Sequence, residues 1–133
     1  MMQRKIDHLG IAVKDLTEAR RRYEMLGFKV SGEEVIAHEK VRVAMVELAG
    51  SRFELLEATS EDSVIAKFVA KRGEGLHHVA VHVDDLEAAV AEMKRNQVRL
   101  VKDAIQIGAG GHKYVFIHPA SAGGVLLELC QDV

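Results

Sequence analysis

The sequence contains two copies of one pattern, and this repeat constrains the fold more than any other feature. Residues 6–16 match residues 76–86 at an offset of 70, and residues 53–55 match residues 127–129 at an offset of 74. The polar residues that recur are His8 with His78, Asp15 with Asp85, and Glu54 with Glu128. Two copies predict two related modules rather than a solenoid, which needs at least three short repeats.

Each copy shows the same order of expected elements. Apolar residues at every second position predict a first strand in 6–13 and in 76–83. Asp15 with Glu18, and Asp84 with Glu87, then indicate the start of a helix. The β-rich segments that follow are 28–37, 41–48 and 52–57 in the first copy, and 98–101, 113–118 and 125–130 in the second. The sequence therefore predicts two tandem βαβββ modules of the α+β class.

The domain organisation follows from length and spacing. A chain of 133 residues with 48% apolar residues can bury one core, so we expect a single domain over residues 1–133. Module one is expected at about 5–58 and module two at about 75–131. Apolar residues at helical spacing in 64–69 predict a linker helix at about 61–73.

Composition excludes several classes of protein. Lys and Arg number 18 against 20 Asp and Glu, and this balance argues against binding to nucleic acid or to an anionic membrane. No apolar run is long enough to span a membrane, and the strand pattern begins at Ile6, too early for a leader peptide. The single cysteine, Cys130, cannot form an intrachain disulfide. We therefore expect a cytoplasmic protein with a small-molecule ligand.

The recurring His and Glu residues predict a metal site. Because side chains alternate in a strand, His8 shares a face with Gly10 and Ala12, which are small. One buried His or Glu is usually structural, and a buried charge is costly unless it is compensated. Packing of the two modules with approximate twofold symmetry would bring together four side chains: His8, Glu54, His78 and Glu128. Two imidazoles and two carboxylates suit a divalent transition metal.

Longer segments of the chain resemble the vicinal-oxygen-chelate superfamily and, within it, the methylmalonyl-CoA epimerase family. The most specific are Gly-Leu-His-His at 75–78 and Gly-Gly-Val-Leu-Leu-Glu-Leu at 123–129. The other similar segments are 6–8, 11–13, 54–57, 62–68, 71–74, 107–111 and 118–119. The resemblance implies two βαβββ modules that form a cupped mixed sheet around a metal ion.

The resemblance also implies a ligand set and a reaction. It assigns the metal to His8, Glu54, His78 and Glu128, with Co²⁺ expected and Mn²⁺, Ni²⁺, Zn²⁺ or Fe²⁺ as alternatives. The implied reaction interconverts the R and S forms of an acyl-CoA, methylmalonyl-CoA, by removal of the α-proton and formation of a metal-stabilised enolate. Glu128 would act as a base as well as a ligand, and a homodimer is expected.

The second base is left open by the sequence. Val43 stands where some members of the family have Glu, and Val cannot transfer a proton. Glu47, on the same strand face as Val43, is the first candidate. The other candidates are His38, His112, Lys113 and a metal-bound water.

A glycine-rich loop at 108–113 is the expected substrate-binding segment. The amides of Gly110 and Gly111 could form an anion-binding nest, and Lys113 would add positive charge for a CoA phosphate or a carboxylate. A plain hairpin loop explains the same glycines equally well.

Three other functions are compatible with such a fold. Glyoxalase I has, by resemblance, a similar metal set and similar enolate chemistry. A protein that sequesters an antibiotic in the same cup can lack the ligands, so four ligands argue against it. An iron-dependent ring-cleaving dioxygenase would use two His and one carboxylate.

Overall fold

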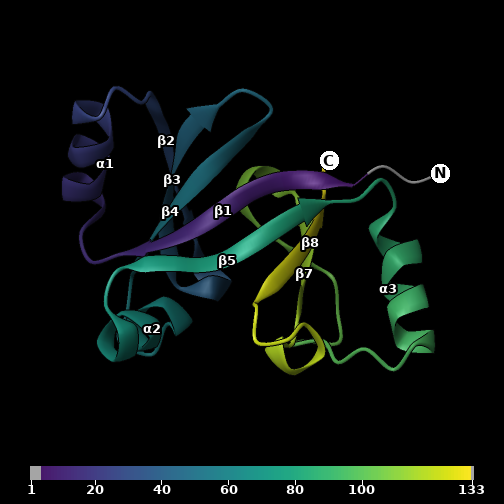
Figure 1. Cartoon of the computed structure of the whole chain (residues 1–133). Helices are drawn as coiled ribbons and strands as arrows, with labels where there is room; N and C mark the ends of the chain where they lie inside the picture. Colours follow the sequence, from purple (N-terminus) through teal and green to yellow (C-terminus); the bar gives the residue numbers. More distant parts are fainter. Residues whose placement is uncertain (1–3, 133) are drawn as a thin grey trace. The chain divides into compact units, whose positions relative to one another are not determined.

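The predicted repeat is present as two βαβββ modules, which confirms the α+β fold class (Figure 1). The structure is a computed structural model and describes residues 4–132. It divides into two compact units: the first unit comprises residues 8–77, and the second comprises residues 78–132 with residues 4–7. Apart from residues 5–7 and 75–77, which begin the first strand of each module, each unit holds one of the repeated modules.

The first unit contains a mixed four-stranded sheet with the strand order β2-β3-β4-β1. Its strand β1 runs parallel to β4, and the other neighbouring pairs are antiparallel. The elements are β1 (Lys5–Val13), α1 (Leu16–Met25), β2 (Val30–Ile36), η1 (Ala37–Glu39), β3 (Val41–Leu48), β4 (Ser51–Ala58) and α2 (Val64–Arg72). Every element expected from the first copy is therefore found, and α2 is the predicted linker helix.

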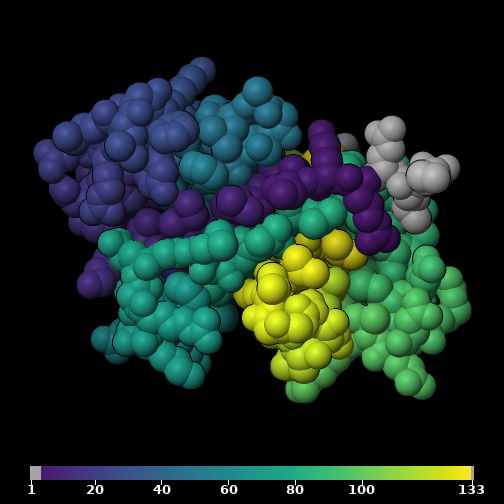
Figure 2. Space-filling model, in the orientation of Figure 1, coloured from purple at the N-terminus to yellow at the C-terminus, as the bar shows by residue number. Residues whose placement is uncertain are grey.

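Helix α1 covers one face of this sheet. Its buried Leu16 and Ala19 pack against Val46 and Leu55, and the rings of Tyr23, Phe28 and Phe53 extend this core. Figure 2 shows the dark-blue side chains of the α1 region against the blue side chains of the β2–β3 hairpin. Because this face holds the apolar core, the alternate residues of β1, β3 and β4 point to the opposite face.

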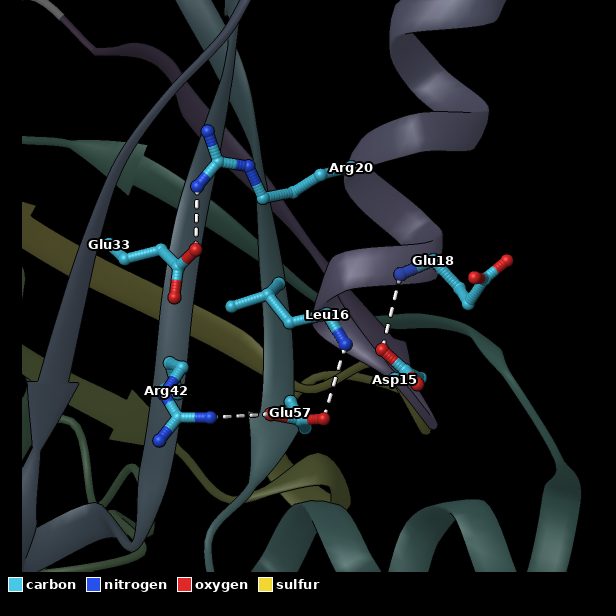
Figure 3. Close-up of polar contacts among 7 residues, drawn as sticks. All are labelled: Asp15, Leu16, Glu18, Arg20, Glu33, Arg42 and Glu57. Atoms are coloured by element: carbon cyan, nitrogen blue, oxygen red, sulfur yellow. Dashed lines mark hydrogen bonds and ion pairs between the residues drawn. The ribbon is translucent and has the colours of Figure 1, made fainter.

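Polar contacts attach α1 to the strands (Figure 3). Asp15 caps the helix, since its Oδ1 accepts a hydrogen bond from the backbone N–H of Glu18 at 3.1 Å. Glu57 accepts the backbone N–H of Leu16 with one carboxylate oxygen, while the other oxygen lies 3.2 Å from Arg42 Nη1. These hydrogen bonds satisfy backbone N–H groups in the first turn of the helix, which have no partner within the helix itself.

Helix α2 begins after a loop in which Asp62 forms an ion pair and a hydrogen bond. Ser63 caps the helix by accepting from the backbone N–H of Ile65. Next to it, Asp62 accepts hydrogen bonds from Lys40 and from Ser60. The hydrogen bond from Lys40, followed by that from Ser60, lowers the pKa of Asp62 to about 2.

The second unit repeats this architecture with the strand order β5-β8-β7-β6. Strand β5 is parallel to β8, and α3 covers the face that carries Val83, Val115, Ile117 and Leu129. The elements are β5 (Gly75–His82), α3 (Leu86–Arg95), β6 (Gln106–Ile107), η2 (Ala109–Gly111), β7 (Lys113–Ile117), η3 (Pro119–Ser121) and β8 (Leu127–Gln131). The residue that caps α3 is Asp85, one position after the predicted Asp84.

One predicted strand is absent from the second unit. Residues 98–101 form only an isolated bridge between Leu100 and Ile117, and the edge strand is the two-residue β6. The apolar side chains of Val98 and Leu100 still pack on the core, which explains their strand-like pattern. Among the described residues, no helix is long and apolar enough to cross a membrane.

Candidate metal and active site

The first unit brings His8 and Glu54 together. In the parallel register of β1 and β4, the residue opposite Glu54 is Gly10, two positions after His8. Glycine has no side chain, so the imidazole of His8 reaches across to the carboxylate, with 3.7 Å between Nε2 and Oε2. Both side chains are largely shielded, and that of Glu54 is 13% exposed.

The second unit brings His78 and Glu128 together in the same way. Here the residue opposite Glu128 is Ala80, again two positions after the histidine. The distance from His78 Nε2 to Glu128 Oε1 is 3.1 Å, and the two side chains are 3% and 9% exposed. Each module therefore builds one largely shielded His–Glu pair on the face opposite its helix.

These pairs have the donor chemistry of a metal centre. Neutral imidazole and carboxylate are ligands that Co²⁺, Mn²⁺, Ni²⁺, Fe²⁺ and Zn²⁺ accept. Burying a carboxylate is costly without a compensating charge or hydrogen bonds, and a cation supplies such a charge. His8, Glu54, His78 and Glu128 are thus suitable ligands by type and by burial.

Two aromatic residues accompany the second pair, and sequence reasoning missed them. Phe116 lies opposite Glu128 in the β7–β8 register, and its ring meets that of His78 edge to face at 5.2 Å. Tyr114, two residues earlier on β7, packs against Phe116 at 5.6 Å and is buried. The period-2 alternation of β7 could have identified both once its register against β8 was known.

The candidate bases lie at different places. Glu47 shares its face with Met45, which lies opposite Glu54 in the β3–β4 register, and Ser31 Oγ donates to Glu47 Oε1 at 2.7 Å. Val43 is buried on this face, and Glu34 of β2 lies opposite it, a placement that sequence reasoning also missed.

The two histidine candidates lie in or next to short 3₁₀ helices. His38 is exposed in η1. His112 follows η2, and its Nδ1 lies 3.3 Å from Asp132 Oδ1.

The glycine-rich loop has a conformation that requires glycine. Gly110 and Gly111 have φ angles of 67° and 81°, in the left-handed region. A Cβ on Gly108 would come within 3.0 Å of the Tyr114 ring. The loop therefore has a defined shape, packed against a residue of the site face.

Lys113 is placed apart from the Glu128 face. Its register on β7 puts it on the same face as Val115, which belongs to the core under α3. Its ammonium lies 3.8 Å from Glu87 of α3 and is 41% exposed. The sequence could not show this, because the face depends on where β7 begins.

Comparison with known proteins gives one consistent result. Residues 7–116 match the glyoxalase/bleomycin resistance protein/dioxygenase superfamily. The chain is 38% identical to a mitochondrial methylmalonyl-CoA epimerase from Homo sapiens, over 96% of this chain and 73% of that protein.

Solved structures agree with this comparison. A methylmalonyl-CoA epimerase from Mycobacterium tuberculosis superimposes with a TM-score of 0.92 at 37% identity, over 96% of this chain and 87% of that chain. A variant of the epimerase from Streptomyces coelicolor, in complex with 2-nitronate-propionyl-CoA, superimposes with a TM-score of 0.92 at 38% identity. The match covers 97% of this chain and 94% of that chain.

Proposed function

Because the chain belongs to the glyoxalase/bleomycin resistance protein/dioxygenase superfamily, we propose that it is an epimerase that interconverts the R and S forms of methylmalonyl-CoA. The observation that carries this proposal is the match to the Streptomyces coelicolor epimerase over 97% of the chain, at a TM-score of 0.92 and 38% identity. The substrate class is thus an acyl-CoA.

The proposal includes one divalent metal ion held by His8, Glu54, His78 and Glu128, with Co²⁺ as the expected ion. The support is the equivalent construction of the two largely shielded His–Glu pairs. When bound, such an ion supplies Lewis acidity that stabilises negative charge on a thioester or carboxylate oxygen. With two carboxylates and two neutral imidazoles, the ligand set neutralises the charge of a divalent ion.

Proton transfer is proposed to use two carboxylates. Glu128 takes the α-proton as the C–H bond breaks. The electron pair of that bond moves into the enolate. A new C–H bond then forms on the opposite face of the same carbon, with the proton delivered by Glu47 or by water that Glu47 holds. General acid–base catalysis of this kind contributes about 10²–10⁴ in rate.

Substrate contacts are proposed for the loop that follows β6. The backbone amides of Gly110 and Gly111 would bind a carboxylate or phosphate oxygen, which their positive φ angles favour. Lys113 would join them only by leaving its ion pair with Glu87, so we expect it to bind the outer part of the CoA.

We further propose that the protein acts in the cytoplasm as a homodimer. The dimer rests on resemblance to the superfamily. The cytoplasmic location rests on the cysteine content, since a single cysteine that cannot form an intrachain disulfide suits a reducing compartment.

The decisive experiment follows the α-proton of one enantiomer of methylmalonyl-CoA in D₂O by ¹H NMR. Three samples are compared: metal-loaded protein, chelator-treated protein and no protein. We expect loss of the α-proton signal together with racemisation in the metal-loaded sample only. Exchange no faster than the protein-free rate would overturn the proposal, and a product from methylglyoxal and glutathione would then favour glyoxalase chemistry.

A further inference from the structure

A second group of metal-binding side chains lies in the second unit, apart from the His78–Glu128 pair. Asp7, His82 and Asp132 each bring one ligand atom within 4.8 Å of the others. Asp7 is buried, the side chain of His82 is 18% exposed, and that of Asp132 is 63% exposed. The group is therefore shielded on one side and open to solvent on the other, so an ion can reach it.

The register of β5 and β8 explains why His82 and Asp132 lie close together. His82 is four residues after His78, and Asp132 is four residues after Glu128, so each keeps the face of its predecessor. The same diagonal that joins His78 to Glu128 is thus repeated further along the parallel strands. At about 3.3 Å per residue the two groups are about 13 Å apart, too far to share one ion.

His82 has a nitrogen that suits a ligand. Its Nδ1 is buried and has no hydrogen-bond partner within residues 4–132. Its other nitrogen, Nε2, lies 3.6 Å from Asp84 Oδ1. Metal-binding histidines commonly have a carboxylate near the second ring nitrogen, which fixes the ring and its tautomer. A cation at Nδ1 would satisfy a buried polar atom that is otherwise costly.

Asp132 is also held in position. Its Oδ1 lies 3.3 Å from Nδ1 of His112, the residue that follows η2. This contact links the carboxylate that follows β8 to His112.

We propose that Asp7, His82 and Asp132 bind a second divalent transition-metal ion, with water in the remaining positions and with His112 as a positioning residue. One imidazole nitrogen and two carboxylates are ligands that Zn²⁺ and Co²⁺ bind well. The inference stands on this cluster and does not depend on the epimerase activity.

The test is a Zn²⁺ titration of the full chain by calorimetry, with bound zinc counted by mass spectrometry. Asp132→Asn and His82→Gln are compared with the wild-type chain and with the matched controls Asp103→Asn and His38→Gln. We expect each of the first two variants to lose one equivalent of zinc and both controls to keep it. His112→Gln should weaken this site by about 10- to 100-fold.

The titration is repeated in a His78→Ala background, so that zinc bound at the second site can be distinguished from zinc bound at the first. Loss of one equivalent on adding His82→Gln in this background supports the second site whatever happens at the first. Failure of the first site alone would appear as an unchanged zinc count when His78→Ala is introduced.

Histidine ring NMR of the wild-type chain provides a test that needs no variant. Zn²⁺ should shift the ring signals of His82 and leave those of His38 in place. Unchanged His82 signals, or full zinc content in Asp132→Asn and His82→Gln, would overturn the proposal.

Discussion

Small residues opposite the glutamates decide the geometry of both His–Glu pairs. Gly10 and Ala80 lie across from Glu54 and Glu128, and neither has a side chain long enough to block the imidazole two positions earlier. The alternation of side chains in a strand therefore predicted the correct face for both histidines. A large residue at either position would fill the space that the imidazole now crosses.

Removal of a single ligand tests the four-ligand assignment. We expect His8→Ala and Glu128→Ala each to lose bound metal and epimerase activity while remaining folded, since both side chains lie outside the apolar core under α1 and α3. Metal content by mass spectrometry and far-UV circular dichroism are measured on the same samples. A variant that keeps its full metal content would contradict the assignment of that residue.

Glu47→Gln separates proton transfer from metal binding. The amide keeps an oxygen that can accept from Ser31 Oγ, but it cannot take up a proton at neutral pH. We expect turnover to fall by about 10²-fold or more with unchanged metal content. Glu34→Gln, on the neighbouring strand, is the matched comparison; equal kinetics for Glu47→Gln and the wild type would remove Glu47 as the second base.

At the level of elements, the two repeated helices begin in the same way. Asp15 accepts the backbone N–H of Glu18, and Asp85 accepts that of Ala88, at 3.1 and 3.0 Å. The aspartates before each helix predicted these starts to within one residue, because a side-chain oxygen there satisfies a donor with no partner inside the helix. In contrast, the pattern at 98–101 predicted a strand that is absent, because burial of apolar side chains does not require a full ladder of backbone hydrogen bonds.

The two helix caps should contribute equally to stability. We expect Asp15→Ala and Asp85→Ala each to lower the free energy of unfolding by about 1 kcal/mol in urea titrations. Asp103→Ala, an exposed aspartate outside any helix, should change it by less than about 0.5 kcal/mol. No difference between the cap variants and this control would show that the caps do not stabilise the helices.

The loop before α2 should contribute to acid stability. Its Asp62 has a pKa lowered from 3.8 to about 2, first by the hydrogen bond from Lys40. A lowered pKa stabilises the folded state above pH 3.8, and this contribution is lost as the pH falls toward 2. In urea titrations from about pH 5 to about pH 2, we expect the stability difference between wild type and Asp62→Asn to shrink across that window. A constant difference would rule out this contribution.

For the whole molecule, binding of the proposed ion should stabilise the fold, because its proposed ligands are positioned only in the folded chain. An ion that binds only the folded state contributes about 2.7 kcal/mol at 100 times its Kd. We expect chelator treatment to lower Tm by several degrees, added Co²⁺ to restore it, and Glu128→Ala to lose most of this response. A Tm that does not change with metal would contradict the proposed metal site.

Local alternation and residue chemistry were enough to predict the repeat, the βαβββ order and the faces of His8 and His78. Register between strands that are distant in sequence is different, because it exists only in the folded chain. That register placed Phe116 opposite Glu128, turned Lys113 toward Glu87 and brought His82 close to Asp132. A shift of one residue in a strand moves a side chain to the other face, and only the paired backbones define that shift.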